Sequence, residues 1–150
     1  MIKHVFITFL IFTVAFVKAQ SRTTIDSLWE VKDYIQALRE SIPNNVNQGA
    51  VKMTKLDSLI GLGTQNKKLF DKQLHLVLSD RQDEIKILLR KYDLVLQSVI
   101  LVKTDMEQQQ LNSRQAKMEK HYFYQNASFL IDRIYFCVNY YKIKIEQNTH

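Results

Sequence analysis

The stretch LHLVLSDRQDEIKILLRKYDLVLQSVILVKTDM, residues 74–106, decides the fold. Its apolar residues recur at alternating intervals of four and three residues, and Arg81 is the polar member of the series. The apolar members are Leu74, Leu78, Ile85, Leu88, Tyr92, Val95, Val99, Val102 and Met106. This spacing puts them on one seam along an α-helix, which is typical of a helix that packs against another helix.

A second, weaker apolar line runs along roughly the opposite face of the same segment. Its members lie seven residues apart and are Ile87, Leu94 and Leu101. The two lines together predict a helix with neighbours on two sides. An unbroken helix from Asn66 to Met106 would be about 60 Å long, more than a compact domain of this size usually holds. We therefore expect either a kink near Ser79-Asp80 or an elongated hairpin, and Arg81 is either an interhelical ion-pair partner or the mark of the kink.

The residues before this segment predict two shorter helices. The first spans about Thr24 to Ile42; Ser27 and Glu30 have capping-box spacing, and Thr23 or Thr24 could equally be the cap. Pro43 ends it, because the residue before a proline avoids the α region. Its apolar stripe consists of Leu28, Val31, Ile35, Leu38 and Ile42.

The second helix is expected from Ala50 to Leu62. Its apolar face consists of Met53, Leu56 and Ile60. Gly61 and Gly63 would close this helix, since glycine readily adopts the left-handed conformation found at helix ends. From Thr64 to His150 no glycine or proline occurs. Strands need frequent turns, and turns draw on those residues, so an all-β fold is excluded.

The last segment, about Ala116 to Glu146, predicts a helix with two apolar faces. We place the reversal of chain direction before it at Asn112-Ser113, in a polar stretch, with a single continuous helix as the alternative. The wide face contains Phe123, Ala127, Leu130, Ile131, Ile134, Cys137, Val138, Tyr141 and Ile145. The second face contains an aromatic strip, Tyr122, Phe129, Phe136 and Tyr140, together with Ile143. A polar ridge between the faces contains Asn126, Arg133 and Lys144.

Length and composition fit one domain. The chain has 150 residues, of which 46% are hydrophobic and 24% charged, as in globular proteins. The net charge of +6 is spread along the chain without a run of like charges, so nucleic-acid binding is not indicated. We expect an all-α fold formed by residues 20–150: an elongated helical bundle or helical hairpin of three to four helices with coiled-coil-like packing.

Residues 1–19 predict a cleaved secretory signal peptide. They contain a basic start, an apolar run from Val5 to Val17 and the small residue Ala19. A membrane-spanning helix needs about 20 apolar residues, more than this run supplies, so we do not expect the run to act as a membrane anchor. No stable membrane span is expected after cleavage. The cleaved chain would begin at Gln20.

The ending Lys18-Ala19-Gln20 is similar to export signals of Bacteroidota, which often leave glutamine as the first mature residue. The resemblance implies a periplasmic or extracellular location in a Gram-negative cell. The alternative is a secreted eukaryotic protein. In that case Asn126-Ala127-Ser128 would be a candidate glycosylation site.

The sequence contains no familiar catalytic or metal-binding motif. None of the patterns HExxH, CxxC, GxGxxG, GxxxxGKS/T and GxSxG occurs. Asp71 and His75 have the spacing of neighbours on a helix, but zinc needs three or four ligands, so we interpret them as a solvated pair. Cys137 is interpreted as a buried, unreactive thiol, with an intermolecular disulfide as the alternative. We expect no enzymatic activity, no cofactor and no metal.

The aromatic strip suggests the kind of function. Tyrosine and phenylalanine are enriched in interface cores, but the strip is also compatible with an ordinary core or an apolar-ligand cavity. We favour an exported, non-enzymatic interaction or assembly protein that presents Tyr122, Phe129, Phe136 and Tyr140 to a protein partner or to another copy of itself. The alternative is a periplasmic carrier, similar in gross properties to holdase chaperones, that encloses an apolar ligand or an unfolded client.

Overall fold

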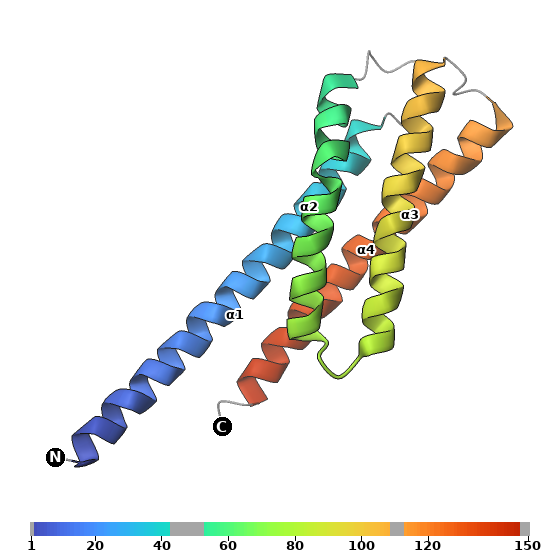
Figure 1. The fold of residues 1–150 in the computed structure, drawn as a ribbon. Coiled ribbons are helices and arrows are strands. Elements are labelled where there is room, and N and C mark those ends of the chain that lie inside the picture. Colours follow the sequence, from blue (N-terminus) through green and yellow to red (C-terminus); the bar gives the residue numbers. More distant parts are fainter. Residues whose placement is uncertain (1, 43–52, 109–112, 148–150) are drawn as a thin grey trace.

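The computed structural model describes residues 2–42, 53–108 and 113–147, with side chains from Arg22 onward. The helices in these ranges are α1 (Ile2–Ser41), α2 (Met53–Val77), α3 (Gln82–Glu107) and α4 (Arg114–Gln147) (Figure 1). No strand occurs in the described ranges, so the prediction of an all-α fold is confirmed. Consecutive helices run antiparallel, and each packs against its neighbours in a ring in which α4 also contacts α1. The molecule is therefore an up-down-up-down four-helix bundle.

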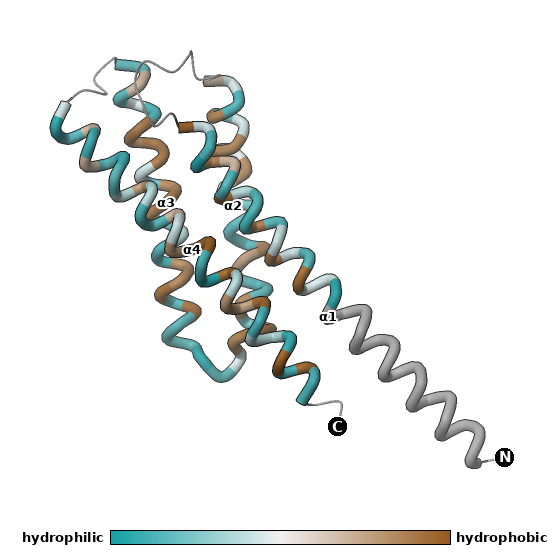
Figure 2. The backbone as a smooth tube through the Cα atoms, turned by 180° about the vertical axis from the view of Figure 1, so that it is seen from behind, coloured by the Kyte–Doolittle hydropathy of each residue, from teal (hydrophilic) through white to brown (hydrophobic). Residues whose placement is uncertain are grey.

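The segment 74–106 belongs to two helices rather than one. α2 ends at Val77 and α3 begins at Gln82, and the Arg81 backbone amide donates a hydrogen bond to the Leu78 carbonyl oxygen at 2.8 Å. The turn between the helices is hydrophilic (Figure 2). The break thus lies at the expected position, but it is a full reversal of the chain rather than a kink.

The N-terminal helices differ from the prediction mainly at their ends. α1 ends at Ser41, in agreement with the proline at position 43. The candidate caps, Ser27 with Glu30 and Thr23 or Thr24, are all wrong, because α1 continues through these residues. Pro43 itself and the expected start of the second helix at Ala50 lie outside the described residues.

The chain also reverses direction between α3 and α4, which run antiparallel. The alternative of one continuous helix is therefore wrong. α3 ends at Glu107, and the Ser113 hydroxyl accepts a hydrogen bond from the Ala116 backbone amide at 3.0 Å. This contact caps the first turn of α4. Asn112, the other residue of the expected reversal, lies outside the described residues.

α2 runs through the two glycines that we expected to close it. A Cβ atom at Gly63 would lie 2.7 Å from the Leu96 Cδ2 atom of α3 and 3.2 Å from the Tyr34 hydroxyl oxygen of α1. A side chain at this position would require the Leu96 side chain to move aside. Gly63 therefore permits α1 and α3 to approach α2 closely, and its role is packing rather than helix termination.

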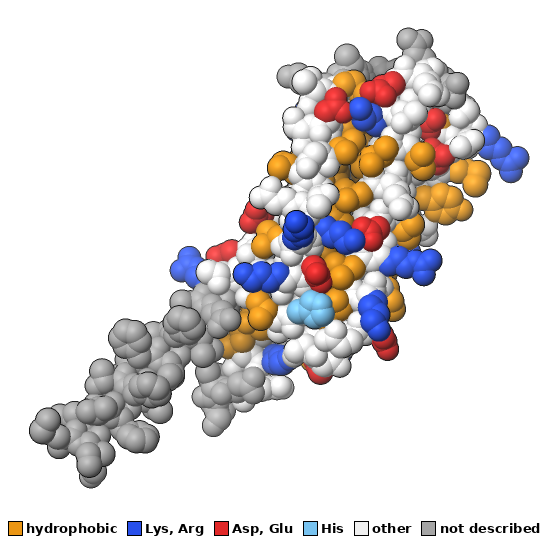
Figure 3. Space-filling view, viewed as in Figure 1, with side chains coloured by type: hydrophobic (Ala, Val, Ile, Leu, Met, Phe, Trp, Pro, Cys, Tyr) orange, Lys and Arg blue, Asp and Glu red, His pale blue; other side chains and the backbone are white. Residues whose placement is uncertain are grey.

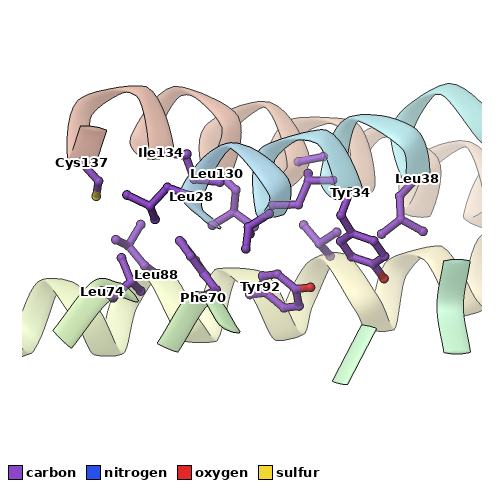
Figure 4. Packing of buried hydrophobic residues seen from close by; sticks show 14 of the residues in the cluster. Leu28, Tyr34, Leu38, Phe70, Leu74, Leu88, Tyr92, Leu130, Ile134 and Cys137 are labelled. Atoms are coloured by element: carbon purple, nitrogen blue, oxygen red, sulfur yellow. The ribbon is translucent and has the colours of Figure 1, made fainter. Parts of the chain in front are cut away.

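The core lies between the four helices and consists mainly of the predicted apolar seams. Side chains that point into it from all four helices include Leu28, Tyr34, Leu38, Phe70, Leu74, Leu88, Tyr92, Leu130, Ile134 and Cys137 (Figure 4). Two phenols bind the α2 backbone, because Tyr34 donates to the Leu59 carbonyl oxygen at 2.9 Å and Tyr92 to that of Gly63 at 3.2 Å. Burial raises the pKa of Tyr34 to about 12 and also raises the pKa of Tyr92, so both hydroxyls stay protonated.

α1 and α4 close the ring although they are distant in sequence. The Tyr124 hydroxyl donates a hydrogen bond to the Ile42 carbonyl oxygen at 2.6 Å. Farther along the same interface, the rings of Trp29 and Tyr135 meet edge to face with centroids 4.9 Å apart. A hydrogen bond and an aromatic pair therefore fix α4 against α1.

Candidate functional site

The aromatic strip lies mostly at the surface of α4. The exposed fraction is 51% for Tyr122, 37% for Phe129 and 36% for Phe136, whereas Tyr140 is partly buried. Within the described part of the chain, no helix covers the first three, so the interpretation as ordinary core is wrong for them. Apolar side chains reach the surface among charged ones elsewhere on the bundle as well (Figure 3).

Two residues of the polar ridge, Asn126 and Arg133, contact α3, whereas the third, Lys144, contacts the turn between α2 and α3. The Lys91 ammonium donates to the Asn126 side-chain oxygen at 3.0 Å, and Arg133 pairs with Glu84. Sequence reasoning did not identify Glu84 and Lys91, although their seven-residue separation matches that of Asn126 and Arg133. We refer to these two contacts as the polar rungs.

The Asn126 amide does not suit a glycan. Its side chain is buried, and its nitrogen donates to the Tyr122 carbonyl oxygen at 2.9 Å while its oxygen accepts from Lys91. Both polar atoms are thus occupied inside the fold. The candidate glycosylation site at Asn126-Ala127-Ser128 therefore lies within the α3–α4 contact.

The weaker apolar line of α3 faces outward. Ile87 is 54% exposed and Leu101 is 48% exposed, while Leu94 is partly buried. The prediction that this line contacts a second neighbouring helix is therefore wrong. The neighbours of α3 in the ring, α2 and α4, pack against other sides of it.

The outward line of α3 lies beside the aromatic strip of α4. The polar rungs place Lys91 opposite Asn126, and the two helices are antiparallel, so positions rise along α3 as they fall along α4. Ile87 therefore lies at nearly the level of Phe129, and Leu94 at nearly the level of Tyr122. Both lines are on the side of the rungs that faces away from the core. We define the α3–α4 face as Ile87, Leu94, Leu101, Tyr122, Phe129 and Phe136.

Two arginines, Arg81 in the turn between α2 and α3 and Arg133 in α4, lie against the rings at the end of the aromatic strip. The Arg81 guanidinium lies 4.7 Å from the Tyr140 ring centroid, and that of Arg133 lies 4.4 Å from the Phe136 centroid. The Phe136 and Tyr140 rings stack with centroids 5.9 Å apart. Both arginines also pair with Glu84, at 3.3 Å for Arg81. Arg81 therefore lies at the predicted break, and its ion pair with Glu84 is a local contact at the start of α3 rather than the interhelical pair offered as the alternative.

A surface hollow of about 460 Å³ lies at the opposite end of the strip, beside the first turns of α4. Its lining residues are Arg114, Lys117, Met118, His121 and Tyr122. Tyr122 thus belongs both to the hollow and to the α3–α4 face. At this end of the α3–α4 face, the basic residues Arg114 and Lys117 therefore lie near Tyr122.

The other candidates lie apart from this face. Cys137 is free and fully buried, as predicted, and burial raises the pKa of its thiol to about 11. The His75 Nε2 atom lies 3.3 Å from the Asp71 Oδ1 atom, and both side chains are half-exposed, as expected of a solvated pair. Among the described residues, no group of three His, Cys, Asp and Glu side chains comes close enough to hold a metal ion.

Comparisons of the chain with protein-family models, with curated proteins and with solved structures find no match. In the described part of the chain, no helix is long and apolar enough to cross a membrane. The fold and the surface together define a class: a four-helix bundle with a partly exposed aromatic face along two adjacent helices.

Proposed function

We propose that this chain is an exported, non-enzymatic interaction protein that binds a protein partner, or another copy of itself, through the α3–α4 face. The observation that supports it best is the joint exposure of Ile87 and Phe129, which lie at the same level on adjacent helices. Contiguous apolar side chains left at a surface mark interaction sites, because covering them releases ordered water.

Export is part of this proposal. The short apolar run in residues 1–19 supports a signal peptide. The buried residues that the structure describes, from Thr24 onward, lie after the proposed cleavage site. The product would begin at Gln20 and act in the periplasm or outside the cell.

The test replaces apolar residues of the face by serine. In Ile87→Ser with Phe129→Ser, we expect self-association or partner capture to weaken while the melting temperature changes little, because both side chains are already partly solvated. Sedimentation, thermal melting and a photo-crosslinking residue at position 129 in cells provide the measurements. Phe136 is left intact, because its ring packs against Arg133.

The matched control is Ile100→Ser. Ile100 is 47% exposed, on the same helix, and points about 140° away from Ile87. Association should be unchanged in this variant. An equal loss in the control, or unfolding of the double variant, would contradict the proposed role of the face.

A further inference from the structure

We infer that the occupant of the α3–α4 face is an acidic amphipathic helix of a partner protein; this inference rests on the function proposed above. The shape of the face suggests a helix. Its apolar residues recur every seven positions on both α3 and α4. From Ile87 to Leu101 they extend about 21 Å, the length of roughly four helical turns. A third helix laid along them would place its own residues i, i+3, i+4 and i+7 against both lines.

The charges around the face suggest an acidic partner. Arg90 lies between Ile87 and Leu94 on the same side of α3, and it forms no ion pair with a described residue. The Lys91 ammonium binds an uncharged amide and lies 5.6 Å from the Phe129 ring centroid, so no carboxylate neutralises it.

The hollow at the end of the face adds to this positive charge. Arg114 and Lys117 line it, and neither pairs with a described carboxylate. Among the acidic residues, Asp83 is paired with Lys86, whereas Asp132 near Phe129 forms no ion pair with a described residue. Asp105, one turn after Leu101, lies beside Glu119 and likewise forms no ion pair with a described residue. Glutamate and aspartate beside the apolar residues of a partner helix would therefore meet unpaired cations at Arg90, Lys91 and the hollow. Asp132 and Asp105 oppose this attraction near Phe129 and Leu101.

A second copy of this chain fits the same face less well. In a two-fold symmetric contact the same patch meets itself. Arg90, Lys91 and the cations of the hollow would then approach a face with the same excess of positive charge, and like charges brought together in an interface cost free energy. An acidic helix avoids this repulsion and gains attraction at long range.

The experiment titrates the purified chain into a labelled synthetic helical peptide and follows fluorescence anisotropy. The probe carries leucines at i, i+3, i+4 and i+7 spacing with glutamates beside them, and its matched counterpart carries lysines in place of the glutamates. We expect the glutamate peptide to bind at least about ten-fold more tightly, with affinity falling as salt rises. Equal binding of the two peptides would overturn the inference.

Variants locate the contact. Ile87→Ser with Phe129→Ser should lower the affinity for the glutamate peptide at least about ten-fold, and Ile100→Ser should not change it. Arg90→Glu, an exposed change that leaves the core untouched, should shift the preference toward the lysine peptide. Binding that none of these variants alters would overturn the inference.

Two further arms separate this inference from the proposed function. Self-association through the face without peptide binding overturns the acidic helix and leaves the proposed function standing. Binding to vesicles of anionic lipid through Phe129 and Arg90, with no binding of either peptide, overturns both the acidic helix and the protein partner.

Discussion

At the scale of single residues, Gly61 and Gly63 meet opposite surroundings although both lie inside α2. A Cβ atom at Gly61 would have no other atom within 4 Å, whereas one at Gly63 would meet Leu96 and Tyr34. Glycine in a helix interior costs about 1 kcal/mol relative to alanine because it loses more backbone freedom on folding. The cost is avoidable at position 61 and is offset by close packing at position 63.

We therefore expect Gly61→Ala to raise the free energy of unfolding by about 0.5–1 kcal/mol. Gly63→Ala should gain less, since Leu96 has to move aside. Gly63→Val should lower the free energy of unfolding by about 2 kcal/mol through overpacking. Urea titration of the three variants measures these differences. Equal gains for the two alanine variants would show that α3 does not approach α2 as closely as described.

At the scale of helices, Glu84 connects three parts of the fold. It accepts Arg81 from the turn and Arg133 from α4, and both arginines in turn lie against the aromatic rings of α4. The neighbouring Asp83 pairs with Lys86 alone, and both of those side chains are almost fully solvated. Glu84, unlike Asp83, therefore links α3 to α4.

Glu84→Gln should lower the free energy of unfolding by about 1 kcal/mol, because two arginines lose a partly buried carboxylate. Asp83→Asn, the matched control, should change it by less than about 0.5 kcal/mol. Urea titrations at low and high salt provide the comparison, and the Glu84 effect should shrink as salt rises. Equal effects at both positions would mean that the arginine contacts do not hold α4 in place.

The faces of the helices were easier to predict than their ends and neighbours. The spacing of four and three residues continues across the turn at Ser79-Asp80, because α2 and α3 bury their seams in one core and no glycine or proline marks the reversal. The two faces of α4 were also visible in the sequence. The position of the second face beside the outward line of α3 could not be predicted, because it depends on which residues of α3 lie opposite Asn126 and Arg133; these are Lys91 and Glu84.

At the scale of the whole molecule, most contacts join helices that follow one another in the chain. The α1–α4 contact is the larger of the two main exceptions, the other being between α2 and α4, and the Tyr124–Ile42 hydrogen bond within it joins residues 82 positions apart. Contacts between sequence neighbours form early because they close short loops, whereas distant contacts form later. We therefore expect α1–α4 closure to be a late step in folding.

Tyr124→Phe should thus act mainly on the unfolding rate. Removal of the hydroxyl leaves the Ile42 carbonyl without this donor and should lower the free energy of unfolding by about 1 kcal/mol. A late contact contributes little to the transition state, so unfolding should become about five-fold faster at an almost unchanged folding rate. Stopped-flow measurements over a range of urea concentrations test this, and slower folding with unchanged unfolding would place closure early.

The late closure has a consequence for a chain that crosses a membrane from its N-terminus onward, as the proposed export requires. α2 and α3 each find a neighbour as soon as the next helix emerges. α1 emerges first, yet the side that carries Trp29 waits for Tyr135, which lies near the end of the chain. This side of α1 stays uncovered during almost the whole of translocation, and it is the surface that a chaperone at the exit would have to protect.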